Sequence, residues 1–387
     1  MTTLLLHSQL ADAIQHYADL SQGKPLQPLA DGSWLVCSHA ACQSLLHNPA
    51  ASVPELSELA YQQQAPERVQ TTLAALARVN NPPMHNTLRR LAEPLFAALL
   101  TAQGQPAALM PRLAQWLESR IDTQSRWDWI ALASELMPRW LLACMDVGEE
   151  DTAHILALLP DLQCIMRPHN TAADWPRIDT AINEISQRLR HSSWLQCTLA
   201  TAPPAQHSAL ITALLGMLIQ SRDAGRGVLS DTLLAWLRGQ ICTFTPTAIH
   251  EVLRFYSPIQ HTRRQLHEGI NLCGQSLPAG AQLILLLAQA NRDSSVFTHP
   301  HCFDSARSNA SAHLTFGEGA HQCLARHAAV AFCQQVFVWL QQRYGRLGWQ
   351  PHPLTYEPLA NARLLQQLWV NVPDLSTTMT AEHELPV

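Results

Sequence analysis

Residues 314–326 read LTFGEGAHQCLAR, and this stretch decides how the rest of the chain is interpreted. Phe316 and two glycines lead into Cys323, which stands at the start of a helical pattern. The positive end of a helix and nearby backbone N–H groups favour a thiolate, and glycines let the backbone approach a flat cofactor without side-chain clash. An isolated cysteine after a Gly-rich turn is more often a buried structural residue, so the surrounding pattern has to decide.

That pattern resembles the FGxGxHxC signature of the cytochrome P-450 superfamily, in its bacterial soluble branch, at Phe316, Gly317, Gly319, His321 and Cys323. The resemblance implies a haem-thiolate enzyme in which Cys323 is the axial ligand of a haem b iron and favours O–O bond cleavage. It also implies that His321 hydrogen-bonds a haem propionate and that Phe316 and Gly317 lie beside the cofactor. Three positions depart from the family pattern: Ala325 replaces a glycine, and Val330 and Phe332 replace an arginine and a glutamate.

Other family motifs follow in the right order. Glu251 and Arg254, in HEVLRFYSP, resemble the structural ExxR pair, and an i, i+3 spacing puts both on one helix face. A lone ExxR means little, because surface helices carry such ion pairs routinely; its place about seventy residues before the cysteine, counted from the sequence, gives it weight. The later stretch NRDSSVFTHPHCFDSAR resembles the family meander, with matching residues at Asn291, Arg292, Asp293, Phe303, Asp304 and Arg307.

Three further residues resemble the family's propionate-binding positions. In NNPPMHNTLRRL, His85 and Arg89 are spaced i, i+4 and therefore face the same way, and a guanidinium suits a carboxylate. Taken alone, such a pair is more often a solvated helix face. In TRRQLHEGINLCGQSLPAG, the spacing to the following turn favours Arg264 over Arg263 as the third propionate partner.

The distal helix is the place where the resemblance weakens. Family members carry an acid followed by a threonine that delivers protons to bound dioxygen, whereas this chain has Asp223 followed by Ala224. We expect Asp223, Ala224 and Ser221 at the catalytic position, with Ser221 or ordered water replacing the missing alcohol. The loss leaves open a peroxide-driven or substrate-assisted oxidation, or a dehydration or isomerisation. Glycines at 225 and 227 are expected to loosen this helix.

Hydrophobic periodicity predicts a mainly α fold with a small β-rich portion, in one domain spanning residues 1–387. Long helical patterns cover Ala209 to Leu237 and Ala325 to Arg343. Strand patterns occur at Gly32 to Val36, Gly269 to Cys273, Gln282 to Leu287 and Leu368 to Val372. Hydrophobic residues form 47% of the chain and charged residues 14%, which is enough apolar material for a large core.

Composition also limits the partners and the compartment. A net charge of -5 without basic runs gives no sign of nucleic-acid or membrane binding. The first residues lack a basic leader, and the ten cysteines form no CxxC pairs, so we expect a cytoplasmic protein with reduced thiols. The chain shows no flavin or iron–sulfur pattern, so the resemblance implies electrons from a separate ferredoxin and ferredoxin reductase.

The resemblance leaves the substrate open. Candidate pocket residues are Gln220, Ile259, Gln260 and His261, within the wider segments 52–79, 220–224 and 258–262. The polarity of Gln260 and His261 suggests a small biosynthetic substrate with a polar handle, such as an amino-acid derivative or a carrier-tethered intermediate. Two other interpretations remain: a haem-binding sensor without turnover, and a zinc site among the histidines and cysteines between 299 and 323, whose spacing does not match known zinc motifs.

Overall fold

The computed structural model describes residues 13–54, 64–101, 104–121, 126–167, 170–349, 351 and 353–372. Helices dominate these residues, which confirms the predicted mainly α class. The α-helices are α1 (Ala13–Ser21), α2 (His39–His47), α3 (Glu67–Ala74), α4 (Met84–Leu99), α5 (Pro106–Ile121), α6 (Trp129–Cys144), α7 (Glu149–Gln163), α8 (Trp175–Leu189), α9 (Ser193–Thr201), α10 (His207–Leu237), α11 (Pro246–Tyr256), α12 (Leu287–Ala290) and α13 (Arg326–Tyr344). Short 3-10 helices are η5 (Ala77–Val79), η6 (Cys164–Met166), η7 (Pro204–Gln206), η8 (Ala310–Ala312) and η9 (Gly319–His321).

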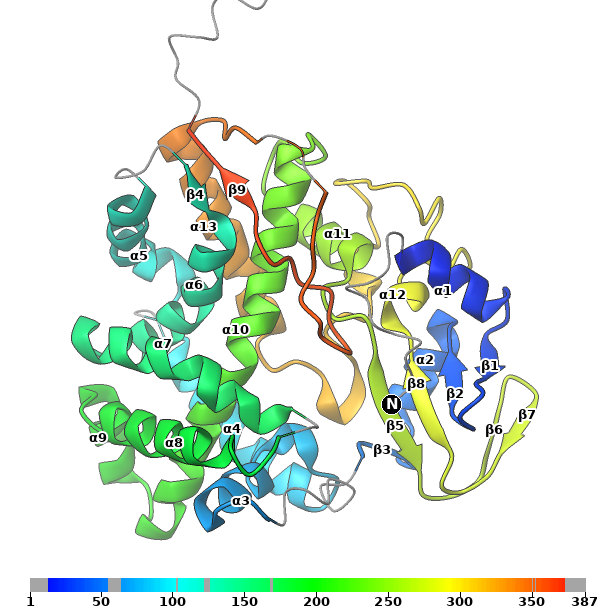
Figure 1. The fold of residues 1–387 in the computed structure, drawn as a ribbon, viewed down its shortest axis with the longest axis horizontal. Helices are drawn as coiled ribbons and strands as arrows, with labels where there is room; N and C mark the ends of the chain where they lie inside the picture. Colours follow the sequence, from blue (N-terminus) through cyan, green and yellow to red (C-terminus); the bar gives the residue numbers. More distant parts are fainter. Residues whose placement is uncertain are drawn as a thin grey trace, which may run out of the picture.

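The β portion is small, and its largest sheet lies beside the helical part in Figure 1, whereas β4 and β9 lie near α6 and α13. Its strands are β1 (Leu26–Pro28), β2 (Trp34–Val36), β3 (Ala51–Ser52), β4 (Trp127–Asp128), β5 (Thr262–Leu266), β6 (Ile270–Leu272), β7 (Gln275–Leu277), β8 (Gln282–Leu285) and β9 (Trp369–Val370). Five of them form a sheet in the order β1-β2-β8-β5-β3, in which β2 and β8 are parallel. The remaining strands form the pairs β4-β9 and β6-β7.

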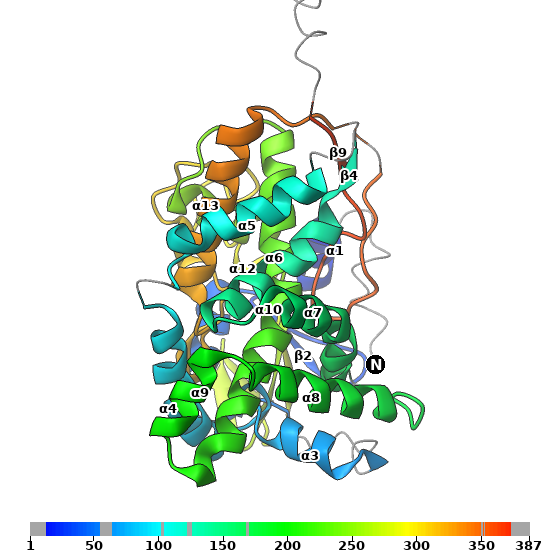
Figure 2. The same ribbon diagram turned by 90° about the vertical axis from the view of Figure 1, so that its left-hand side faces the viewer.

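The long helix α10 is the central element of the helical part (Figures 1 and 2). It contacts α4, α6, α7, α8, α11 and α13. Two glycines allow its close packing: a Cβ on Gly225 would lie 2.6 Å from the Met137 Cβ, and a Cβ on Gly227 would lie 2.6 Å from the Pro258 Cβ. The helix runs unbroken through both glycines, so they serve close approach here rather than the loosening that was expected.

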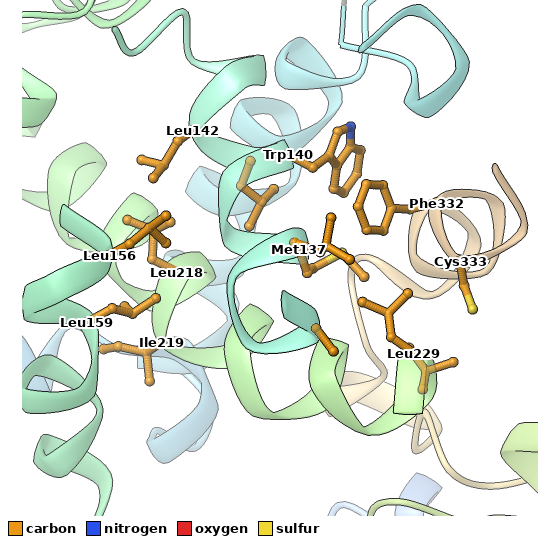
Figure 3. Packing of buried hydrophobic residues seen from close by; sticks show 14 of the residues in the cluster. Met137, Trp140, Leu142, Leu156, Leu159, Leu218, Ile219, Leu229, Phe332 and Cys333 are labelled. Carbon is orange, nitrogen blue, oxygen red and sulfur yellow. The ribbon is translucent and has the colours of Figure 1, made fainter. Parts of the chain in front are cut away.

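The core beside α10 explains one departure from the family pattern. Phe332 on α13 is fully buried and stacks on Trp140 of α6, with ring centroids 5.1 Å apart. Figure 3 shows the two rings facing each other, with Met137 next to them. Val330 is also buried. Phe332 and Val330 therefore occupy buried positions at which a charged side chain would lose its hydration. The stacking of Phe332 on Trp140 stabilises the packing there.

Both long helices predicted from sequence are present, and each differs from its predicted bounds by two residues or fewer. Three of the four predicted strands correspond to β2, β6 and β9, and the fourth ends early because α12 begins at Leu287. By length and composition alone, the segment Gly319–Tyr344 could cross a membrane. In the fold, however, α13 packs against α5, α10 and α11, so its apolar residues contribute to the core.

Candidate functional site

The segment before α13 forms a tight loop around Cys323. Gly317 and Gly319 have positive φ values of 62° and 65°, a region that glycine enters without steric cost. A Cβ on Gly319 would lie 2.2 Å from the carbonyl oxygen of Leu46, so only glycine allows α2 to approach so closely. The backbone N–H of Cys323 donates to the carbonyl of Phe316 at 2.9 Å, which closes the loop. The cysteine is thereby held just ahead of the α13 N-terminus.

The environment of the Cys323 sulfur combines burial with positive charge. Burial raises the pKa of its thiol, while a backbone N–H of Ala325 and the charges of Arg89 and Arg326 act in the opposite direction. The thiol is therefore the stable form in the absence of a bound cation. A coordinated metal ion reverses this balance, because coordination removes the thiol proton. The N–H group and the two arginines then favour the thiolate that results.

Four further predicted residues converge near this loop, and we refer to His85, Arg89, Arg264 and His321 as the His–Arg cluster. His85 begins α4 and His321 ends η9, and their ring centroids are 4.1 Å apart. Burial and then the nearby His85 and arginines lower the pKa of His321 to about 3, so its ring is neutral at neutral pH. A neutral imidazole carries one N–H that donates to an acceptor such as a carboxylate.

Arg264 and Arg89 supply the charge of the cluster. Arg264 lies on β5 with only 4% of its surface exposed, and burial followed by the charge of Arg78 lowers its pKa to about 10. Arg89 donates from Nε to Glu93 Oε1 at 2.7 Å, and Glu93 is half exposed. Apart from Glu93, the structure records no carboxylate paired with this cluster among the described residues. Four donors and a local deficit of carboxylates fit the two propionates of a haem, and the buried sulfur of Cys323 fits its iron.

The ExxR pair forms a buried ionic network below this loop. Both Glu251 and Arg254 are fully buried, and two nitrogens of Arg254 donate to the carboxylate at 2.7 and 2.8 Å. Arg307 from the meander donates to the same carboxylate at 3.0 Å. Arg254 also donates to the carbonyls of Asn291 and Pro300, both at 2.9 Å. The network connects α11 to the meander at residues 291–307. This geometry supports the fold and presents no group to a substrate.

On the distal side, α10 presents an accessible stripe. Gln220 and Ala224 are exposed in the middle of the helix and Ser221 is half-buried, whereas residues 225–235 are buried. The Ser221 hydroxyl donates to the carbonyl of Leu218 at 2.9 Å. The amide of Gln220 donates to the Gly216 carbonyl at 3.1 Å. The methyl group of Ala224 therefore lies on this stripe, and the Ser221 hydroxyl is hydrogen-bonded within its own helix. The predicted catalytic role of Ala224 and Ser221 stays a prediction.

Asp223 lies in a network of charges. Its Oδ1 is 3.6 Å from nitrogens of both Arg222 and Arg226. Arg226 is buried and donates to Glu357 Oε1 at 3.3 Å, and Arg222 donates to Gln163 Oε1 at 2.8 Å. Two guanidinium groups therefore face two carboxylates in this network.

The other predicted pocket residues differ in how accessible they are. Ile259 is half-buried, whereas Gln260 and His261 are almost completely buried. The Gln260 side chain accepts from the Tyr17 hydroxyl at 2.8 Å and donates to the backbone of Ser257. His261 Nε2 lies 2.8 Å from the Ala360 carbonyl oxygen. A substrate role for these buried residues stays a prediction. Of the predicted pocket segment 52–79, residues 55–63 lie outside the described part of the chain.

Arg78 belongs to this site but was missed by the sequence analysis. It lies on η5, which packs against α4, the helix that carries His85 and Arg89. Its charge also contributes to the lowered pKa values of His321 and Arg264. It also interacts with Asp223 of the distal helix. No motif marks it: it is a lone arginine seven positions before His85, in an otherwise unremarkable stretch.

The histidines and cysteines between 299 and 323 were considered as a zinc site. Within the described residues, no three His, Cys, Asp or Glu side chains are grouped so that they could hold a metal ion. His313 instead forms hydrogen bonds to two partners: its Nε2 lies 3.2 Å from His250 Nδ1, and its Nδ1 accepts from the Thr315 N–H. The geometry of the described residues therefore does not support the zinc interpretation.

Comparison with known proteins gives consistent results. The sequence model of the cytochrome P450 family matches residues 239–360. A biotin biosynthesis cytochrome P450 of Bacillus subtilis (strain 168) is 42% identical over 122 residues, which is 32% of this chain and 31% of that protein. A 20-oxo-5-O-mycaminosyltylactone 23-monooxygenase of Streptomyces fradiae is 44% identical over 84 residues, 22% of this chain and 20% of that protein. These matches thus span less than a third of the length of the curated relatives.

The structural likeness extends much further along the chain. The crystal structure of P450BioI in complex with hexadec-9Z-enoic acid ligated acyl carrier protein superposes with a TM-score of 0.77. It covers 94% of this chain and 99% of that chain at 22% sequence identity. At that level of identity the likeness establishes the fold, which is the fold implied by the sequence resemblance.

Proposed function

The chain belongs to the cytochrome P450 family, and from this premise we propose that it is a haem-thiolate monooxygenase that inserts one oxygen atom from dioxygen into a small organic substrate. The observation that carries the proposal is the loop that holds the half-buried Cys323 beside the four donors of the His–Arg cluster. A thiol and a carboxylate-binding group in one site match the two ends of a haem, its iron and its propionates.

Haem b bound in this site would supply an iron centre that activates dioxygen, and a thiolate ligand favours cleavage of the O–O bond. Cys323 would hold the iron, and the His–Arg cluster would hold the propionates. The ring centroids of Phe316 and His313 are 5.3 Å apart, and the Phe316 carbonyl accepts from the Cys323 N–H, so Phe316 would line the site at the start of the loop. The buried ion pair of Glu251 and Arg254 would stabilise α11 and the meander, which precede the cysteine loop in the chain.

Proton delivery is the step for which this chain differs from its family. Asp223 is the predicted catalytic acid on α10, but its carboxylate faces two arginines and Ala224 offers no hydroxyl. Protons would therefore pass through ordered water near the accessible stripe, or come from the substrate itself. The same observation favours a second candidate function, oxidation driven by hydrogen peroxide, which requires no proton relay for splitting dioxygen.

We further propose that a ferredoxin and a ferredoxin reductase supply the electrons and that the enzyme works in the cytoplasm. The proposed substrate is a small biosynthetic molecule with a polar handle, either free or tethered to a carrier. Two relatives support this class: one is described by its part in biotin biosynthesis, and a solved neighbour holds a fatty acid ligated to an acyl carrier protein.

Product formation under two oxidant regimes tests the proposal. The purified holoprotein is incubated with a panel of fatty acids and amino-acid derivatives, free or as pantetheine thioesters. One set receives ferredoxin, reductase and NADPH, and the other receives hydrogen peroxide. Oxygenated product only with the reductase system supports the monooxygenase, whereas product only with peroxide supports the second candidate. A haem-thiolate protein that oxidises no compound of the panel in either regime would speak for the sensor interpretation.

A further inference from the structure

Two histidine rings lie in contact between α11 and the segment that leads into the cysteine loop. His250 on α11 is half-buried and His313 is buried, and their ring centroids are 5.4 Å apart. His250 Nδ1 lies 3.2 Å from His313 Nε2. The pair therefore connects a partly accessible histidine to a buried one.

The second nitrogen of His313 determines which ring donates the hydrogen bond. The backbone N–H of Thr315 donates to His313 Nδ1 at 3.2 Å, so this nitrogen carries no proton. Burial, followed by the charges of His250, Arg254 and His39, lowers the pKa of His313 to about 3, so its ring is neutral at neutral pH. A neutral imidazole that accepts at Nδ1 carries its single proton at Nε2. His313 Nε2 therefore donates to His250 Nδ1, and His250 Nδ1 has to be unprotonated.

Protonation of His250 removes this hydrogen bond. In an imidazolium ion both ring nitrogens carry hydrogen, so Nδ1 no longer accepts and its N–H faces the N–H of His313. Burial and then the charge of His327 on α13 lower the pKa of His250 from its usual 6.5. The hydrogen bond is therefore intact at neutral pH and is lost only when the protein is acidified.

The elements packed against α11 give a protonated His250 little compensation. The short helices α12 and η8 carry no titratable side chain. On α10, the charges of Asp231 and Arg238 act on Tyr256, at the other end of α11. The Glu251 carboxylate, next to His250 in the sequence, is already paired with two buried arginines. Among the described residues, the groups recorded as acting on the two rings are thus basic and oppose protonation.

The segment after His313 leads directly into the cysteine loop. The ring centroids of His313 and Phe316 are 5.3 Å apart. The Phe316 carbonyl accepts from the Cys323 N–H at 2.9 Å, and this hydrogen bond closes the loop. A short series of contacts therefore connects His250 to the backbone of the cysteine.

We propose that His250 is a positioning residue for the cysteine loop: its neutral ring holds His313 in place, and its protonation loosens the loop and favours loss of the Cys323 ligand. The inference rests on the proposed haem-thiolate function and adds a residue outside the haem site that determines how firmly the thiolate is held. When the sulfur leaves the iron it takes up a proton, so acid also favours this loss directly. The test therefore has to separate the direct effect of acid from the effect of His250.

Two variants of His250 make that separation. His250→Asn places an amide oxygen near the position of Nδ1, so the side chain accepts from His313 at every pH. His250→Lys carries a permanent positive charge and only donors. His267→Asn is the matched control, because it replaces an exposed histidine directly after β5.

Absorption spectra of the reduced, carbon monoxide-treated holoproteins, taken from about pH 7.5 to about pH 5, measure the outcome across the range in which histidine titrates. The far-red Soret band reports haem that keeps the thiolate, and a band at shorter wavelength reports haem that has lost it. On acidification, the ratio of lost to kept thiolate should rise about 2-fold to 10-fold more in the wild-type protein than in His250→Asn, the worth of one hydrogen bond. His250→Lys should show this excess already at the highest pH, and His267→Asn should follow the wild-type curve.

Two results would overturn the inference. One is a His250→Asn curve that coincides with the wild-type curve. The other is a His250→Lys protein that is folded by circular dichroism and keeps its thiolate as well as the wild-type protein does at the highest pH. If the lysine variant does not fold, the comparison of the asparagine variant with the wild-type protein decides alone. Failure of the proposed function looks different, because the wild-type protein would then show no far-red band at any pH.

Discussion

The Glu251 carboxylate is the anion of a buried ionic network. Removing its charge should therefore lower the free energy of unfolding by a measurable amount. The carboxylate accepts hydrogen bonds from Arg254 at 2.7 and 2.8 Å, from Arg307 at 3.0 Å and from the Asp304 N–H at 2.9 Å. Glu251→Gln keeps the shape of the side chain but leaves two buried guanidinium groups without their counter-charge. Breaking a buried pair in this way costs about 3–5 kcal/mol of folding free energy.

Equilibrium unfolding in urea, followed by far-ultraviolet circular dichroism, measures this change. The matched control is Asp179→Asn, which removes the same charge from a pair that lies near the surface. Arg68 Nη1 and Asp179 Oδ2 are 3.1 Å apart, with side-chain exposures of 48% and 29%. Exposed pairs of this kind contribute less than about 1 kcal/mol. The urea midpoint should therefore fall sharply for Glu251→Gln and barely move for the control.

A similar small shift for both variants would refute the reasoning. It would mean that the buried guanidinium groups find other acceptors, or that water reaches them, when the carboxylate loses its charge. The carbonyls of Asn291, Pro300 and Cys302 already accept from Arg254, and that of Cys302 also accepts from Arg307. In that case the ExxR pair would be dispensable for folding.

Three more predictions concern the loop, its histidine and the distal helix. Gly319→Ala should destabilise the protein and lower its haem content, because the new methyl group would meet the Leu46 carbonyl oxygen at 2.2 Å; an unchanged melting temperature and haem content would contradict this. Burial lowers the pKa of His313 from its usual 6.5 to about 3, so on acidification this histidine gains its proton in the unfolded chain before it does so in the folded protein. The free energy of unfolding should therefore fall as the pH drops from about 6.5 toward 3. His313→Asn should flatten that part of the curve in urea midpoints measured at several pH values, and an equally steep loss in the variant would show that another group is responsible. Ala224→Thr places a hydroxyl on the accessible stripe and should raise the rate of product formation with ferredoxin and reductase, by at most the roughly 10²- to 10⁴-fold that general acid–base catalysis contributes; no gain would indicate that the proton path lies elsewhere.

The cysteine loop could be predicted from sequence because its chemistry and its spacing are both local. Each of Phe316, Gly317, Gly319, His321 and Cys323 lies within eight residues of the others. The positive φ angles, the closing hydrogen bond and the helix start follow from that short stretch. The long helices were predictable for a related reason, since their periodicity repeats over many residues.

Long-range packing could not be read from sequence. The glycines of α10 looked like weak points, but Met137 and Pro258 pack directly against them from elements far away in the chain. Arg307 shares the carboxylate of Glu251 across 56 positions, and no spacing rule predicts that contact. Such contacts depend on the tertiary fold, which local propensity does not encode.

Arg78 shows the same limit in the functional site. Its importance comes from two neighbours, Asp223 and Arg264, which are more than a hundred residues further along the chain. A single arginine in a loop carries no sequence signal of its own. The structure reveals it because η5, which carries Arg78, packs against α4, and because Arg78 interacts with Asp223 and Arg264.

The absorption spectrum of the reduced, carbon monoxide-treated protein tests the central claim most directly, namely that Cys323 ligates a haem iron through its sulfur. Wild-type protein should show a Soret band shifted far to the red, and Cys323→Ala and Cys323→His should abolish that shift. Protein that binds no haem, or a band that the substitutions leave unchanged, would contradict the account.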